Sequence, residues 1–103
     1  MKFYLGTNWK MHKTVAEALA YTEGLAHYAK DYPQFQFFII PSYTALWQVR
    51  QKVDALGAPI WVGAQNTHWE DQGAFTGEIS PVQLKEIGLD LVEIGHSERR
   101  QYY

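Results

Sequence analysis

Short hydrophobic runs alternate with helical patterns along this chain, and this alternation limits its possible folds more than any other feature. Four such runs cover residues 3–7, 35–40, 60–64 and 89–94, and they are rich in branched aliphatic and aromatic side chains. Their first residues lie roughly 25 to 32 positions apart, which is the length of a βαβ unit. Because these units join parallel strands by right-handed crossovers, we predict an α/β fold whose strands all end at one edge.

Helix start and stop signals separate the hydrophobic runs. Thr14 and Glu17 form a capping box, in which each side chain can bond the backbone N–H of the other residue. Gly57 and Gly88 are suited to end the second and third helices, because glycine readily adopts the left-handed conformation found there. The three predicted helices cover residues 15–29, 44–56 and 81–87.

Two folds are built from this unit, the doubly wound open sheet and the (β/α)8 barrel. Both place functional residues beyond the carboxyl ends of the strands. A complete barrel typically has about 250 residues, so a chain of 103 residues would form only part of one. In either fold, the candidate site is made of the segments that follow the strands: residues 8–10, 41–43, 65–78 and 96–100.

Composition excludes several classes of partner. The formal net charge is −2 and the isoelectric point is about 6.0, so no broad positive field would attract nucleic acid or an anionic membrane. The chain has no cysteine, which rules out disulfides and thiolate metal sites.

The longest apolar run, residues 37–40, is far shorter than a membrane span. The N-terminal run is too short for a signal peptide, and we expect a cytoplasmic protein.

Two of the strand-end segments carry side chains with a clear chemical use. Lys10 beside Asn8 could hold an anionic oxygen through charge and a hydrogen bond. His96 precedes Ser97, a good N-cap, and the positive end of a helix dipole disfavours the imidazolium. A neutral His96 could then donate its N–H to a developing oxyanion. The plainer alternatives are a solvated loop lysine and a histidine that caps a strand. No metal site is expected, since ligand spacing is missing at the other histidines, His12, His27 and His68.

The long segment between the third strand and the third helix suggests an interaction loop. Gly73 and Gly77 flank Phe75 and Thr76, and this pattern predicts a tight, protruding finger. Loops of this length in compact domains commonly bind something, and an exposed aromatic side chain would favour a protein interface. An ordinary long surface loop is the alternative.

Taken together, four segments resemble the triosephosphate isomerase family in their order and spacing. They are Gly6–Met11, Gly63–Asn66, Gly73–Ser80 and Ile94–Arg100. The resemblance runs over nearly all of the chain but covers only about two-fifths of a complete barrel. It implies the N-terminal half of a (β/α)8 TIM barrel in the order β-α-β-α-β-α-β, with residues 1–103 forming a partial domain that lacks the second half.

The family interconverts dihydroxyacetone phosphate and glyceraldehyde 3-phosphate through an enediolate, in glycolysis and gluconeogenesis, and uses no cofactor. The resemblance therefore implies a triose phosphate substrate. By the matching motifs, Asn8 and Lys10 would bind this substrate, and Lys10 would supply positive charge. His96 would polarise the carbonyl, a role for a neutral histidine that is well established in this enzyme. Glu98 would support these residues.

The resemblance also implies a homodimer, because the finger around Thr76 matches the loop that docks into the neighbouring subunit. The residues expected at that interface are Gln65, Phe75, Thr76, Gly77 and Glu78. His12 departs from the asparagine common in the family. The catalytic glutamate, the lid and the phosphate-binding glycines are not found in these residues, so the chain alone is expected to be nearly inactive. The alternatives are a non-catalytic half-barrel that binds a complementary half or itself, and a stand-alone binder of phosphate-bearing ligands.

Overall fold

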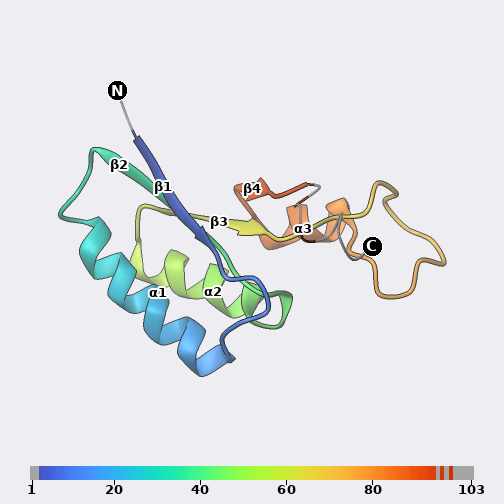
Figure 1. Cartoon of the computed structure of the whole chain (residues 1–103), viewed down its shortest axis with the longest axis horizontal. Coiled ribbons are helices and arrows are strands. Elements are labelled where there is room, and N and C mark those ends of the chain that lie inside the picture. The colour runs from blue at the N-terminus through green and yellow to red at the C-terminus, as the bar shows by residue number, and fades with distance from the viewer. Residues whose placement is uncertain (1–2, 95, 97, 99–103) are drawn as a thin grey trace.

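A computed structural model of the chain describes residues 3–94, 96 and 98 (Figure 1). Strands and helices alternate from the first element to the last, which confirms the predicted order. The elements are β1 (Phe3–Asn8), α1 (Val15–Ala29), β2 (Phe35–Ile40), α2 (Tyr43–Leu56), β3 (Ile60–Ala64), α3 (Pro81–Ile87) and β4 (Leu91–Val92).

All strand pairs are parallel, and the strands lie side by side in the order of the chain, β1-β2-β3-β4. A doubly wound sheet reverses its strand order at a switch point, whereas a barrel adds each new strand on the same side of the last. The described strands show no such reversal. The fold is therefore the first half of a TIM-type barrel, as the resemblance implied.

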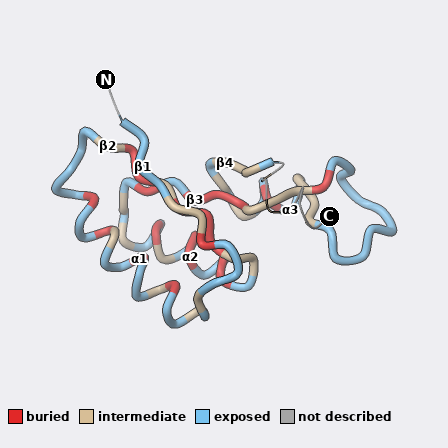
Figure 2. Tube along the Cα trace, in the orientation of Figure 1, coloured by how far each residue is buried: buried red, intermediate tan, exposed pale blue. Residues whose placement is uncertain are grey.

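The helices α1 and α2 cover one face of the sheet and enclose the core (Figures 1 and 2). Strand residues on this face are almost fully buried, including Phe37, Ile39 and Val62. Small side chains such as Ala18 and Ala45 let the helices approach closely. The two faces differ because successive strand residues point to opposite sides of a sheet.

The opposite face of the sheet carries the candidate site at its carboxyl end. Tyr4 and Trp61 lie on this face, with ring centroids 5.7 Å apart. Positions two and four residues further along these strands share the face, so Asn8 and Gln65 end up at the same edge. The alternation along the strands thus explains why side chains 57 residues apart come within hydrogen-bonding distance.

Three predicted elements differ from the observed ones in their bounds. Helix α2 begins at Tyr43, one residue before the predicted start, and β1 extends to Asn8. The strand predicted over residues 89–94 was wrong in length, because β4 spans only Leu91–Val92. This last described strand pairs with β3 alone. The backbone nevertheless continues the ladder, since Asp90 and Glu93 donate their N–H groups to Val62 and Ala64. Within the described residues, no helix is long and apolar enough to cross a membrane.

Candidate active site

The end of β1 holds Lys10 in an unusual backbone conformation. Its φ is 55°, a region that costs a non-glycine residue roughly 1–3 kcal/mol. Three side chains hold this backbone: Asn8 Oδ1 accepts from the Lys10 N–H at 2.8 Å, and Ser42 and Gln65 donate to its carbonyl at 2.8 and 2.6 Å. Side chains from three strand ends thus fix where the Lys10 side chain starts.

The Lys10 ammonium pairs with the carboxylate of Glu98. Nζ and Oε1 are 2.6 Å apart, and both side chains are about half exposed, at 51% and 43%. The hydrogen bond and the charge of Lys10 lower the pKa of Glu98, and the same contact with Glu98 raises the pKa of Lys10. Both groups therefore stay charged near neutral pH.

The geometry around His96 decides which ring nitrogen carries the proton. The Glu98 backbone N–H donates to His96 Nδ1 at 3.0 Å. Because a backbone N–H can only donate, Nδ1 is an acceptor here, and the proton of a neutral imidazole is on Nε2. The site therefore presents an N–H donor at Nε2, as expected for an electrophile. Ser97, the N-cap invoked in the sequence argument, lies outside the described residues.

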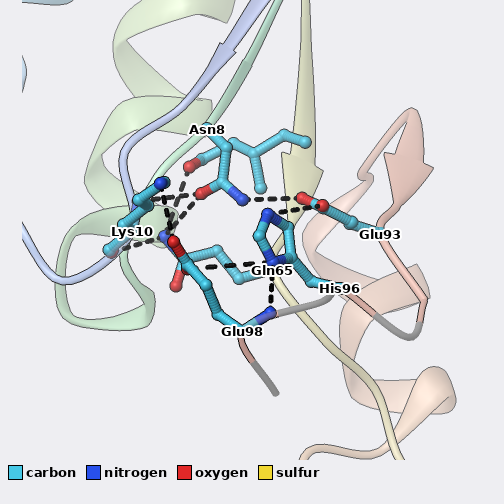
Figure 3. A network of polar contacts seen from close by, with 7 residues as sticks. Asn8, Lys10, Gln65, Glu93, His96 and Glu98 are labelled. Carbon is cyan, nitrogen blue, oxygen red and sulfur yellow. Dashed lines mark hydrogen bonds and ion pairs between the residues drawn. The ribbon is translucent and has the colours of Figure 1, made fainter. Parts of the chain in front are cut away.

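Glu93 belongs to the same network, although its sequence position did not single it out. Its Oε2 accepts a hydrogen bond from Asn8 Nδ2 at 2.7 Å, and its Oε1 lies 3.5 Å from His96 Nε2. Figure 3 shows Lys10 and Glu93 on opposite sides of the His96 ring. A charged residue in a largely apolar strand run was the available signal.

A cavity of about 200 Å³ opens among these side chains, lined by Asn8, Lys10, Tyr43, Gln65, Asn66, His96 and Glu98. This volume suits a ligand smaller than a drug-sized molecule, whose sites start near 300 Å³. An ammonium, the His96 ring and amide groups surround it, together with the Glu98 carboxylate that pairs with the ammonium. Such a set can hold an anionic group and polarise a neighbouring carbonyl.

Comparison with known proteins places this arrangement in a family. The sequence model described as triosephosphate isomerase matches residues 3–103. The chain belongs to the triosephosphate isomerase family. This match confirms the resemblance found in the strand-end motifs, and it includes the ends of all four strands.

Three similar relatives within this family carry one name, L-erythrulose-1-phosphate isomerase. The Brucella abortus protein is 52% identical over 103 residues, covering 99% of this chain and 40% of its own length. The Mycolicibacterium smegmatis protein is 52% identical over 106 residues, covering 99% of this chain and 39% of its own length. The Rhizobium meliloti protein is 51% identical over 102 residues, covering 97% and 39%. The chain thus spans about two-fifths of the curated relatives it matches.

The structure brings together one part of the predicted site set and separates the other. One group lines the cavity: Asn8, Lys10, Gln65, His96 and Glu98. The other group lies on the exposed loop between β3 and α3 (Figure 2): Phe75, Thr76, Gly77 and Glu78. Gln65 was expected beside a dimer interface, and here its amide contacts the Lys10 carbonyl. Whether a second subunit also covers it stays a prediction.

The loop itself has the two features expected of a protruding finger. Gly73 and Gly77 adopt positive φ angles of 144° and 89°, which favour glycine. Phe75 is 43% exposed and rests against the buried His68 ring, with centroids 4.4 Å apart.

Within the described residues, no group of three histidine, aspartate or glutamate side chains could hold a metal ion.

The pair of Lys10 and Glu98 predicts a pH window for this family site. The pKa of Glu98 lies below its ordinary value of 4.5, and the pKa of Lys10 lies above 10.5. The carboxylate's contribution is lost as the pH falls through the lowered pKa, and the ammonium's as the pH rises through the raised one. The pair should therefore be fully formed between these ordinary values. Carboxyl NMR titration should show a lowered Glu98 pKa that rises in Lys10→Met. A wild-type Glu98 pKa at or above 4.5 contradicts this.

Proposed function

We propose that the complete protein containing this chain isomerises a short ketose phosphate by moving its carbonyl to the adjacent carbon. The observation that carries the proposal is the shared cavity, where the Lys10 ammonium and the His96 Nε2–H flank a space for a small anion. Nε2–H would donate to the carbonyl oxygen and stabilise the enediolate. Lys10 and Asn8 would bind the anionic substrate.

The reaction also needs a base that takes a proton from one carbon and returns it to the next. The two carboxylates of the described site are both engaged, Glu98 with Lys10 and Glu93 with Asn8. We therefore propose that the base comes from another part of the complete protein, whose relatives are about two and a half times longer. The 103 residues alone should then be nearly inactive.

The substrate proposed first is L-erythrulose 1-phosphate, because relatives about 50% identical to this chain carry its name. Triose phosphate, the substrate that the strand-end motifs implied, is the second candidate, and the family description supports it. The proposal also retains a homodimer formed through the Thr76 finger, whose exposed Phe75 offers an apolar contact. The alternative is a non-catalytic half-barrel. Residues 3–5 of β1 expose large apolar side chains, which would let the chain bind a complementary half-barrel or a second copy of itself.

The test is a kinetic comparison of the complete protein with the 103-residue chain. We expect the complete protein to isomerise L-erythrulose 1-phosphate with kcat/KM at least about tenfold above that for dihydroxyacetone phosphate. The kcat/KM of the 103-residue chain should be lower than that of the complete protein by about 10² to 10⁴, because it has no positioned base. Absence of isomerisation of both substrates by the complete protein overturns the proposal. A preference for dihydroxyacetone phosphate would make the second candidate, triose phosphate, the substrate.

A further inference from the structure

We infer that Glu93 sets substrate preference by accepting a hydrogen bond from a hydroxyl group found on a four-carbon ketose phosphate and not on a triose phosphate. The inference rests on the proposed isomerase function and adds the residue that reads the length of the carbon chain. Glu93 would be a binding residue for the substrate's non-phosphorylated end, while Lys10 serves the anionic end.

The placement of the Glu93 carboxylate leaves one oxygen available for a ligand. Oε2 is held by Asn8 Nδ2 at 2.7 Å, which fixes the carboxylate at the edge of the sheet. Oε1 lies 3.5 Å from His96 Nε2, longer than a good N–H···O bond of about 2.9 Å. The side chain is 26% exposed. It does not itself line the cavity but contacts two residues that do, Asn8 and His96, so it is placed to meet a ligand that extends past them. A carboxylate oxygen accepts two hydrogen bonds, and Oε1 therefore has capacity to spare.

The chemistry of the two candidate substrates differs at one place. In both, the carbonyl lies between the phosphorylated carbon and the carbon that loses a proton. In both, that second carbon carries a hydroxyl; in L-erythrulose 1-phosphate it also carries a hydroxymethyl group, whereas in dihydroxyacetone phosphate a second hydrogen takes the place of this group. The extra hydroxyl is thus a near neighbour of the oxygen bound by His96 Nε2. An acceptor 3.5 Å from Nε2 is within reach of that hydroxyl.

The charge arrangement gives the substrate a direction. Lys10 and Glu93 lie on opposite sides of the His96 ring (Figure 3). Each side carries a carboxylate, Glu98 beside Lys10 and Glu93 on the other side, but among the residues drawn in Figure 3 the ammonium lies only on the Lys10 side. The phosphate end of the substrate would therefore lie on the Lys10 side. The uncharged hydroxymethyl end would then face Glu93. A site that hydrogen-bonds a substrate hydroxyl discriminates strongly against an analogue that lacks it, because its own partly buried acceptor is left unpaired.

The test uses the complete protein and measures the effect of removing the Glu93 carboxylate, the substrate's extra hydroxyl, or both. Wild type, Glu93→Gln and Glu93→Val are assayed with L-erythrulose 1-phosphate, its 4-deoxy analogue and dihydroxyacetone phosphate. We expect removal of the hydroxyl to lower wild-type kcat/KM by about 10- to 100-fold, the effect of a hydrogen bond to a charged group. In Glu93→Val the same removal should change kcat/KM by less than about threefold. Glu86→Gln, an exposed carboxylate on α3, is the matched control.

The outcomes separate this inference from the proposed function. A wild type that isomerises neither substrate contradicts the proposed function itself. An active wild type whose Glu93 variants lose the same factor with all three substrates contradicts the inference, because Glu93 would then only position Asn8 and His96. Equal sensitivity to the deoxy analogue in wild type and Glu93→Val contradicts it as well. If Glu93→Val does not fold, Glu93→Met, which keeps the length of the side chain without a carboxylate or amide oxygen, decides the question by the same criterion.

Discussion

Lys10→Met is expected to lower kcat/KM of the complete protein by about 10² to 10³, the usual effect of removing a group that stabilises developing negative charge. Methionine has a similar length but no charge. The change also leaves the Glu98 carboxylate without its partner at 2.6 Å, so a negative charge faces the anionic substrate. Both effects act in the same direction, and steady-state kinetics with the preferred substrate measures them.

Stability should hardly change in the same variant. The Lys10–Glu98 pair is about half exposed, and exposed ion pairs contribute at most about 1 kcal/mol. Lys13→Met is the matched control, because Lys13 is also a lysine at positive φ but lies over the Trp9 and Tyr21 rings. We expect it to leave kcat/KM within about twofold, since its charge serves local packing. Similar losses in both variants, or a Lys10→Met enzyme within threefold of wild type, would contradict the role given to Lys10.

The order of elements was predictable because local signals agree with the tertiary fold. The capping box at Thr14 is present, with Glu17 donating its N–H to Thr14 Oγ1 at 3.3 Å and accepting from the Thr14 N–H at 3.0 Å. Gly57 and Gly88 end their helices in the left-handed conformation, as predicted. The length of β4 was not predictable, because apolar character persists to Ile94 while pairing depends on where β3 ends.

Only those site residues could be predicted whose place at the end of a strand was enough to bring them to the site. Asn8, Lys10 and His96 follow strands, so parallel topology alone gathers them at one edge. Glu93 sits within a strand-like run, and its contact with Asn8 spans 85 residues. That contact depends on which side of the backbone the Glu93 side chain leaves after β4 ends and on how far the sheet curves. Neither property is visible in a run of residue types, so the contact between Glu93 and Asn8 could not be predicted from the sequence.

Arg50 was missed for a similar reason, since a polar residue on a helix is usually solvated. Its side chain is only 10% exposed. Its guanidinium pairs with Asp90 Oδ2 at 2.8 Å and with Asp54 Oδ1 at 2.7 Å, and it donates to the Gly88 carbonyl at 3.3 Å. Asp90 Oδ2 also accepts the Val62 N–H at 2.9 Å. One carboxylate thereby connects α2, β3 and the start of β4.

Asp90→Ala is expected to lower the free energy of unfolding of the complete protein by about 2–4 kcal/mol. Removing one partner of a buried pair costs about 3–5 kcal/mol when the remaining charge is uncompensated. Here Arg50 keeps its contact with Asp54 at 2.7 Å and Asp90 is 33% exposed, and both reduce the effect. Asp54→Ala removes the other partner of the same arginine, but Asp54 is 65% exposed. Its loss should be about 0.5 kcal/mol. Urea unfolding with an unchanged m-value measures both variants.

A double variant shows whether the loss of a charge partner at Arg50 is the cause. Arg50→Met together with Asp90→Ala removes the guanidinium that is otherwise left with Asp54 as its ion-pair partner, and methionine keeps the apolar contacts of the arginine stem. The double variant should therefore be more stable than Asp90→Ala alone, which is a favourable coupling between neighbouring sites. Because Asp90 lies three residues before Glu93 and anchors the start of β4, Asp90→Ala should also weaken any preference that Glu93 confers. Equal losses for Asp90→Ala and Asp54→Ala would show that the pair with Asp90 has no special part in holding β4.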